Sequence, residues 1–285
     1  MRILVTGATG FVGRDVVAQL ARAGVRVRAL TRDPGRARFP AGVEVVRGDL
    51  LSPASLAAAL EGVERMYLFP VDETATEVVA RARAAGVRRI VDLSAASVTV
   101  GLHDNPVERA VEASGLAWTH VRPGGFMANM LQIWAPSVRA ERVVRYPFGD
   151  RPDYSIHEAD IAAVAVAALL EDGHHGQAYT LTGPGPITVR EQVAAIGAAL
   201  GEPVRYEEVT RERARELMLA QGGFAAEAAD LMLGFVDYGG EAAAGGQSDQ
   251  DWSALMKTWP DVERVTGRPP RTFAEWARDH VADFR

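Results

Sequence analysis

The fold of this chain is decided by its first residues, Met1-Arg-Ile-Leu-Val-Thr-Gly-Ala-Thr-Gly-Phe-Val-Gly13. The apolar run Ile3–Val5 predicts a strand, and three glycines follow it at positions 7, 10 and 13. A segment with helical apolar spacing, residues 11–23, comes directly afterwards. A strand, a glycine turn and a helix in this order form the arrangement that binds the pyrophosphate of a dinucleotide. A plain strand–turn–helix would account for the fold but not for three glycines at this spacing.

Each glycine has its own role in that arrangement. Gly7 permits a tight turn, Gly10 lets the backbone approach the phosphates, and Gly13 lets the helix pack closely against the strand. The helix N-terminus offers unpaired N–H groups and the positive end of its dipole to the anion. The residues of the same turn that we expect to contact the cofactor are Thr9, Phe11 and Val12.

Composition narrows the class of protein. The chain has 285 residues, of which 48% are hydrophobic, and a formal net charge of -6. It shows no apolar run long enough to span a bilayer, no signal peptide and no basic cluster, so we expect a cytoplasmic protein without membrane or nucleic-acid partners. The absence of cysteine excludes disulfides and thiolate chemistry. We expect no metal site, because His174 and His175 lack ligand partners at a suitable spacing.

Strand and helix patterns alternate through the first half of the chain. Such alternation predicts a doubly wound, mostly parallel α/β sheet of the Rossmann type, with ligands at the carboxyl ends of the strands. The predicted strands are 3–5, 25–30, 43–46, 65–69, 89–93 and 117–121, and the predicted helices are 11–23, 53–61 (with Ser52 as N-cap), 73–86 and 105–115.

The rhythm changes after about residue 123. We therefore expect a dinucleotide-binding Rossmann domain over residues 1–150, with part of 175–185 a candidate to return to its sheet, and a smaller mixed lobe over 151–285 that covers the substrate. The elements predicted in this half are strands at 143–149 and 177–182, helices at 158–171, 188–201, 210–221 and 272–281, and a glycine-rich turn at 239–246.

The end of the second strand bears on which dinucleotide is bound. An NAD site usually carries a carboxylate there, which binds the ribose hydroxyls. Here the strand ends in Thr31-Arg32-Asp33, and the Arg32 guanidinium favours a 2′-phosphate and can stack on adenine, so NADP(H) is the predicted cofactor. The alternative is a surface arginine with Asp33 as the ribose ligand. Arg28 or Arg36 is available to assist Arg32.

Residues after the third and fourth strands are expected at the same edge. Asp49 is placed to accept from the adenine amino group, with Leu50 against the ring; the alternative is that Asp49 caps the next helix. Phe69 and Pro70 end the fourth strand and would line the path from adenosine to nicotinamide.

Several segments together resemble the NmrA-like group of atypical short-chain dehydrogenases/reductases, which includes type-2 quinone oxidoreductases and is related to isoflavone-type reductases. The resemblance implies NADP(H) bound across the sheet edge and a substrate cleft under the C-terminal lobe. The matching segments are Gly7-Ala-Thr-Gly-Phe-Val-Gly13, Thr31-Arg-Asp-Pro34, Gly48-Asp-Leu50, Ser114-Gly-Leu-Ala-Trp-Thr-His-Val-Arg-Pro-Gly-Gly-Phe-Met-Ala-Asn129 and Asp160-Ile-Ala162.

The chain departs from this resemblance in its catalytic residues. Lys257 is the only lysine, so the Tyr-x-x-x-Lys pair of ordinary short-chain enzymes and the catalytic lysine of the isoflavone-type branch are both missing. Hydride transfer can survive this loss, since much of its acceleration comes from geometry. The candidate catalytic residues are the hydroxyls of Ser94 and Ser97, after the fifth strand, and His103 in the next loop, whose ordinary pKa suits a general acid. Turn-forming serines and a solvated histidine are the alternatives.

An apolar stretch follows the sixth predicted strand. Phe126, Met130 and Trp134 fall one helical turn apart and are our candidates for substrate binding, as the wall of a cleft for a flat ring system. A core-facing helical stripe explains the same spacing equally well.

These observations favour an NADPH-dependent reductase of the atypical short-chain type. Its acceptor would be a ketone, quinone or conjugated enone on a hydrophobic molecule, for instance a polycyclic aromatic natural product in a ketoreductase reaction of a GC-rich bacterium. The alternative is a sensor that binds NADP(H) without turnover and signals to a partner protein, and a third is an isomerase or epimerase. The sequence does not fix the oligomeric state.

Overall fold

The computed structural model describes residues 1–237, 240 and 253–285, so the predicted glycine-rich turn at 239–246 lies outside the described residues except for Gly240. The chain forms two compact units. The first, which we call the sheet unit, comprises Met1–Pro123, Glu158–Leu181 and Trp259–Pro269; the second unit comprises Gly124–His157, Thr182–Thr258 and Pro270–Arg285. The structure thus divides the chain at five points, because several later segments return to the sheet unit, whereas the sequence suggested one boundary near residue 150 with part of 175–185 as a candidate to return. In the part of the chain that is described, no helix is long and apolar enough to cross a bilayer.

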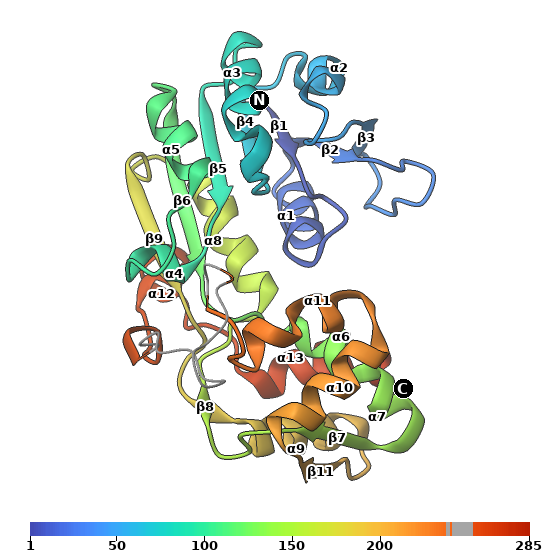
Figure 1. Cartoon of the computed structure of the whole chain (residues 1–285). Helices are drawn as coiled ribbons and strands as arrows, with labels where there is room; N and C mark the ends of the chain where they lie inside the picture. Colours follow the sequence, from blue (N-terminus) through green and yellow to red (C-terminus); the bar gives the residue numbers. More distant parts are fainter. Residues whose placement is uncertain (238–239, 241–252) are drawn as a thin grey trace. The chain divides into compact units, whose positions relative to one another are not determined.

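The sheet unit is built on seven parallel strands in the order β3-β2-β1-β4-β5-β6-β9 (Figure 1). This is a doubly wound α/β sheet, as the alternating pattern predicted. On one side of β1 lie β2 and then β3, and on the other side lie β4, β5 and β6 in turn. Beyond β6 the edge strand is β9, which comes from the part of the chain after residue 123. The strands are β1 (Arg2–Val5), β2 (Arg26–Thr31), β3 (Glu44–Arg47), β4 (Arg65–Leu68), β5 (Arg89–Leu93), β6 (Ala117–Pro123) and β9 (Gln177–Leu181).

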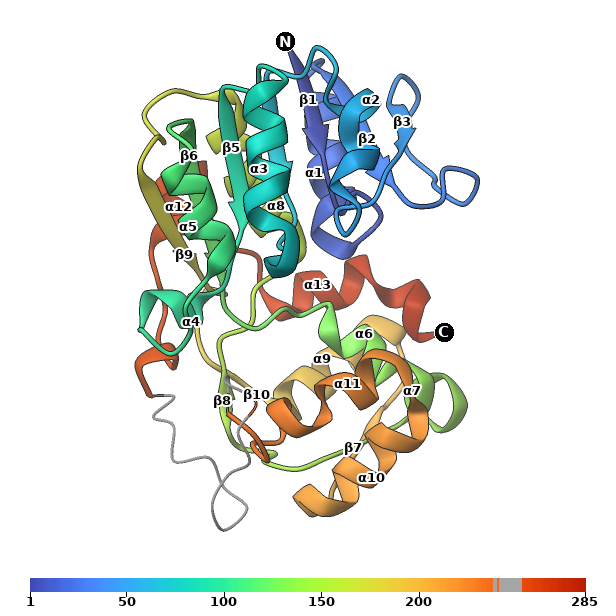
Figure 2. The ribbon, with the colours of Figure 1, turned by 45° about the horizontal axis from the view of Figure 1, so that its top comes forward.

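Helices cover both faces of this sheet. In Figure 2, α3 and α5 lie in front of the strands, while α1 and α8 lie behind them. The middle of α8 is buried on nearly all sides, which its Ala, Val and Ile content dictates, since a helix without a polar face must be covered. The helices are α1 (Phe11–Arg22), α2 (Ala57–Leu60), α3 (Ala75–Ala84), α4 (Ala96–Thr99), α5 (Pro106–Ala113), α8 (Glu158–Leu170) and α12 (Asp261–Thr266), with short 3-10 turns at Pro53–Leu56 and Asp72–Thr74.

The second unit has its own apolar core and two small sheets. The sheets are the parallel pair β7–β11 and the antiparallel pair β8–β10. The apolar core of this unit includes the fully buried Trp276. The elements are α6 (Asn129–Ile133), α7 (Ala135–Glu141), β7 (Val143–Tyr146), β8 (Pro152–Asp153), β10 (Ile187–Thr188), α9 (Val189–Leu200), β11 (Arg205–Glu208), α10 (Arg211–Gln221), α11 (Gly223–Met232), α13 (Phe273–Asp279) and 3-10 turns at Ser253–Leu255 and Val281–Phe284.

Two local predictions are corrected by the structure. Ser52 does not cap the following helix with its side chain, because the segment begins as a 3-10 turn at Pro53. The Ser55 hydroxyl closes that turn instead: it accepts from the Asp49 N–H at 2.9 Å and donates to the Ser52 carbonyl at 2.7 Å.

Arg28, the second correction, is structural. Its side chain points into the sheet unit, where the residue is only 5% exposed. It donates to the carbonyl oxygens of Ala58, Ala59 and Glu61 at 2.8–3.0 Å, at the end of α2. These carbonyls have no helical partner of their own, so the guanidinium takes over their hydrogen bonds. Arg28 is therefore not available to assist a cofactor phosphate.

Replacing Arg28 by Leu should lower the free energy of unfolding by about 3 kcal/mol, because three carbonyl groups lose a charged donor. Urea denaturation of the Arg28→Leu variant measures this. The matched control is Arg36→Leu, whose side chain is 90% exposed and should change the value by less than about 0.5 kcal/mol. Equal effects of the two substitutions would contradict the structural role.

Candidate functional site

The glycine turn between β1 and α1 is closed by contacts that exclude side chains. Gly7 has a φ of +58°, and a Cβ atom there would lie 2.8 Å from Cβ of Phe69. A Cβ on Gly13 would lie 2.1 Å from the Gly7 carbonyl oxygen, well inside van der Waals contact. The Gly10 N–H donates to the same oxygen at 3.0 Å. Glycine at 7 and 13 is therefore required by the turn itself.

Thr6 ties this turn to the neighbouring strand. Its hydroxyl donates to the Tyr67 carbonyl at 3.0 Å and accepts from the Phe69 N–H at 2.7 Å. Phe69 is thereby held against Gly7 at the carboxyl end of β4, with 43% of its surface exposed. Sequence reasoning missed Thr6, although a hydroxyl directly before the first glycine was the available signal.

The first turn of α1 is open to an anion. The helix begins after Gly10, which has extended backbone and no side chain with which to cap the first N–H groups. No acidic residue lies in the first turn. Thr9 is exposed and Phe11 half-buried, whereas Val12 is buried, so Val12 offers its backbone rather than its side chain.

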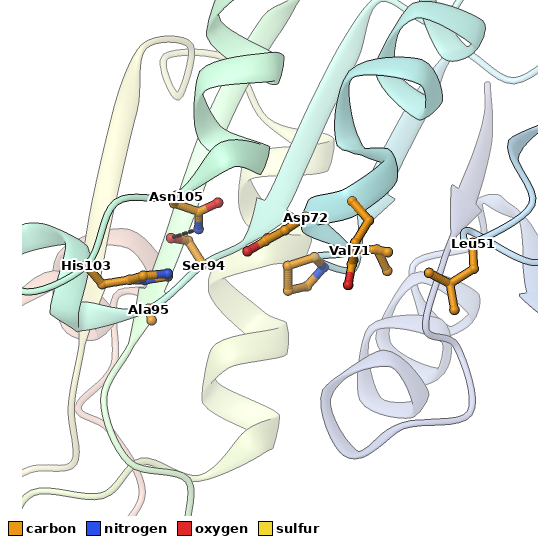
Figure 3. A pocket seen from close by; sticks show the side chains of 9 residues that line it. Leu51, Val71, Asp72, Ser94, Ala95, His103 and Asn105 are labelled. Atoms are coloured by element: carbon orange, nitrogen blue, oxygen red, sulfur yellow. Dashed lines mark hydrogen bonds between the residues drawn. The ribbon is translucent and has the colours of Figure 1, made fainter. Parts of the chain in front are cut away.

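A pocket of about 480 Å³ lies at the same edge of the sheet unit, beyond the carboxyl ends of β4 and β5 (Figure 3). Of the predicted site residues, it brings together Pro70, Ser94 and His103. In Figure 3 the His103 ring and the Asn105 amide both lie beside Ser94. The complete lining is Leu51, Pro70, Val71, Asp72, Glu73, Ser94, Ala95, His103 and Asn105.

Other predicted cofactor residues lie around this edge with mixed roles. Arg32 is exposed at the end of β2, while Asp33 is engaged in its own turn, accepting from the Gly35 N–H at 3.2 Å. The Asp49 carboxylate accepts from the Leu51 N–H at 3.0 Å, which is a local turn contact and not the helix cap that the sequence offered as the alternative. Leu50 is only 7% exposed and belongs to the core of the sheet unit. Its neighbour Leu51 is the exposed apolar side chain and lines the pocket.

Ser97 and two of the proposed substrate residues lie inside the protein. Ser97 is 1% exposed in α4 and is not among the residues that line the pocket. Met130 and Trp134 are 9% and 2% exposed and belong to the core of the second unit, which is the core-facing stripe that their spacing also allowed. Phe126 is half-buried in that unit, where it forms a β-bridge with Ile156.

Asn105 is a pocket residue that sequence reasoning missed. It precedes Pro106 as the N-cap of α5, and its Oδ1 accepts from the N–H groups of Val107 and Glu108 at 2.9 and 3.2 Å. Its Nδ2 donates to the Ser94 hydroxyl at 2.9 Å. The available signal was Asn-Pro directly before a helical pattern, a common N-cap sequence.

Behind Ser94, α5 and β6 form a buried ion pair. Both carboxylate oxygens of Glu108 accept from the Arg122 guanidinium, at 2.8 and 2.6 Å. Burial raises the pKa of the Glu108 carboxyl, but hydrogen bonds from Arg122 and Ser94 and nearby positive charge outweigh it, so that pKa lies below its usual range. Glu108 is thus held as a carboxylate beneath the pocket floor.

His120 and Asp92 form a second buried pair beside it. The two side chains come from neighbouring positions of β5 and β6, and His120 Nδ1 lies 2.7 Å from Asp92 Oδ1. Burial raises the pKa of Asp92; burial also opposes the charged form of His120, but its bonds to Asp92 raise the pKa of His120 overall. Oxygen and nitrogen atoms of Asp92, Glu108 and His120 lie within 4.8 Å of one another, yet Arg122 already serves as the cation for Glu108. This arrangement favours an ion-paired network over a metal site.

Comparison with known proteins gives relatives along almost the whole chain. The sequence model of the NmrA-like family matches residues 1–277. A (4-alkanoyl-5-oxo-2,5-dihydrofuran-3-yl)methyl phosphate reductase of Streptomyces griseus is 41% identical, over 99% of both chains. An NAD(P)H azoreductase of Xenophilus azovorans is 38% identical, again over 99% of both chains. Among solved structures, an NADPH-dependent quinone oxidoreductase of Escherichia coli, complexed with NADPH, has a TM-score of 0.76 and 26% identity over 97% of this chain and 99% of that chain.

The Glu108–Arg122 pair should make a pH-dependent contribution to stability. Because the folded pKa of Glu108 is lowered, its contribution is present above the ordinary carboxyl pKa and is lost as pH falls through the folded value. Glu108→Gln should therefore cost about 2 kcal/mol of unfolding free energy at about pH 7 and much less at about pH 3. Urea midpoints at the two pH values measure this.

The control for that measurement is Glu77→Gln, which removes an exposed ion pair with Arg81 within one helix. It should change stability by less than about 0.5 kcal/mol at either pH. A cost of Glu108→Gln that stays constant across this pH range would show that the carboxylate charge is not what stabilises the pair.

Proposed function

This chain belongs to the NmrA-like family, and we propose that it is an NADPH-dependent reductase that transfers hydride to a quinone or a conjugated enone carried by a small hydrophobic molecule. The observation that carries the proposal is the position of the pocket, which opens at the carboxyl ends of β4 and β5, the sheet edge that also bears the glycine turn. In doubly wound sheets this edge, beside the strand where the order reverses, is where nucleotides and substrates meet.

The residues of the sheet unit fit a dinucleotide phosphate. Gly10 has no side chain that could hinder an approach to the helix N-terminus, and no acidic residue in the first turn of α1 would compete with an anion for the first N–H groups. Arg32 is exposed at the end of β2, where it can bind a 2′-phosphate, while Phe69 and Pro70 continue the edge toward the pocket. When bound, NADPH supplies the hydride for the reaction.

The relatives support a reductase. The named substrate of the Streptomyces griseus enzyme is a methyl phosphate of a dihydrofuranone with an alkanoyl group, and the Escherichia coli enzyme is named for quinones. Both kinds of molecule contain a carbon–carbon double bond conjugated to carbonyl groups. The apolar part of the pocket lining, Leu51, Pro70, Val71 and Ala95, suits a planar system of this kind.

A conjugated acceptor also explains how the reaction proceeds without the Tyr-x-x-x-Lys pair. Hydride addition to a simple ketone leaves an alkoxide, a strong base that needs a proton donor in the transition state. Addition to a quinone or an enone leaves a negative charge spread over a phenolate or an enolate, which is a much weaker base. Water, or the imidazole of His103 in the pocket, is then a sufficient proton source.

Turnover with a panel of acceptors tests the proposal. We expect NADPH consumption, followed at the nicotinamide absorbance, with quinones and with enones flanked by two carbonyls, and a rate at least about 100-fold lower with simple ketones, since those need the missing general acid. NADPH that binds, as seen by tryptophan quenching, but is not consumed by any acceptor would favour the sensor. An equal rate with simple ketones would contradict the role assigned to conjugation.

Arg32 provides a separate test of the cofactor. Arg32→Ala should raise the Kd for NADPH by about 10- to 100-fold through loss of a charged hydrogen bond to the 2′-phosphate, and should change the Kd for NADH less than about 2-fold. Isothermal titration calorimetry measures both. Arg26→Ala, exposed at the opposite end of β2, is the control and should change neither value. A loss shared equally by the two cofactors would assign Arg32 to adenine stacking instead.

A further inference from the structure

We propose that Arg14, the fourth residue of α1, binds the diphosphate of the dinucleotide, and that Phe11 is the positioning residue that holds its guanidinium at the start of the helix. Arg14 would then contact every dinucleotide, whereas Arg32 distinguishes those that carry a 2′-phosphate. The inference rests on the proposed function for one point only, that the diphosphate lies at the first N–H groups of α1.

The guanidinium of Arg14 lies over the first turn of α1. Phe11 is the first residue of the helix, and the guanidinium carbon of Arg14 lies 5.5 Å from the centroid of its ring. Residues three apart share one face of a helix, and helical side chains lean toward the N-terminus. The positive charge is therefore carried back to the end of the helix where an anion binds.

This position of the charge brings the helix itself no benefit. A cation stabilises a helix near its C-terminus, where Arg22 lies in α1, and is unfavourable beside the N-terminus. Arg14 is exposed, and no carboxylate in the described parts of the chain pairs with it. The protein without ligand therefore bears a local electrostatic cost that a bound anion removes. Departures from a local rule of this kind are expected at functional sites.

The Phe11 ring reduces the entropy that Arg14 loses on binding. A mobile arginine side chain has many rotamers, and fixing them weakens binding. The cation–π contact with Phe11 holds the guanidinium in place before the ligand arrives. Phe11 is itself held, because it is half-buried and directly follows Gly10, whose N–H donates to the Gly7 carbonyl oxygen.

A diphosphate suits this set of donors. The first N–H groups of α1 have no side-chain cap and no acidic neighbour in the first turn, so they are available to one phosphate. The planar guanidinium fork beside them can bind two oxygens of the same anion. Helix and arginine thus supply donors to one group, on which the charge of both phosphates is concentrated.

The decisive variant is Arg14→Gln, which removes the charge and keeps a residue that favours helix. We expect the Kd values of NADPH and of NADH each to rise about 10-fold in isothermal titration calorimetry, because both molecules carry the diphosphate. The nucleotide 2′-AMP, which has the 2′-phosphate but no diphosphate, should bind as it does to the wild type. Arg32→Ala should give the reverse pattern, with weaker binding of NADPH and 2′-AMP and little change for NADH.

Arg22→Gln is the matched control, since it removes an exposed arginine from the other end of the same helix. It should change none of the three Kd values. The melting temperature of the ligand-free Arg14→Gln variant should fall by less than about 2 °C, which separates loss of binding from loss of the helix.

A double-mutant cycle tests the role of Phe11. Phe11→Leu keeps an apolar side chain but removes the aromatic ring face, and should raise the Kd of both dinucleotides about 2- to 5-fold. Combined with Arg14→Gln it should add no further loss, because the ring acts through the guanidinium. Fully additive losses would contradict the positioning role.

Kd values for NADPH and NADH that Arg14→Gln leaves unchanged overturn the inference. A loss confined to NADPH and 2′-AMP also overturns it, because Arg14 would then bind the 2′-phosphate. Either result, with a wild type that binds and consumes NADPH, leaves the proposed function intact. A wild type that binds neither dinucleotide overturns the proposed function itself.

Discussion

The contact between Gly13 and the Gly7 carbonyl is the constraint on which the sheet unit depends. The start of α1 lies so close to the turn that a single methyl group at position 13 would overlap the backbone. This close approach sets where the helix begins and leaves its first N–H groups uncapped at the edge of the sheet. Thr6 then fixes the end of β4 to the same turn, so that Phe69 and the pocket beyond it are placed relative to the glycine turn.

Beneath the pocket the protein places charge where most folds place apolar side chains. Asp92, Glu108, His120 and Arg122 lie together between α5 and the sheet, paired with one another. Such pairs are seldom the most stabilising choice, because removing charges from water costs about as much as the pairing returns. Their value here is positional: the Glu108–Arg122 pair ties α5, whose N-cap Asn105 lines the pocket, to β6.

Much of the fold follows from local sequence, since the period of the apolar residues determines whether a segment becomes a strand or a helix. The residues of the site were harder to predict from the sequence. Leu50 and Leu51 have the same side chain. Only the turn after β3 determines that Leu50 packs in the core and that Leu51 lines the pocket. Met130 and Trp134 have the spacing of a cleft wall and of a core stripe alike. Arg28 shows the same limit, because an arginine inside a strand pattern gives no sign of the carbonyl groups that it will bind.

The discontinuity of the sheet unit has a consequence for how the chain folds during synthesis. Its three segments are separated by two of the three stretches that build the second unit, so the covering helix α8 and the edge strand β9 emerge well after β6. Until they arrive, β6 has an unpaired edge and the part of one sheet face that α8 covers is exposed, which are features that favour association between nascent chains. Contacts across such long sequence separations also form slowly. Most of the chain must therefore leave the ribosome before the sheet unit can be completed.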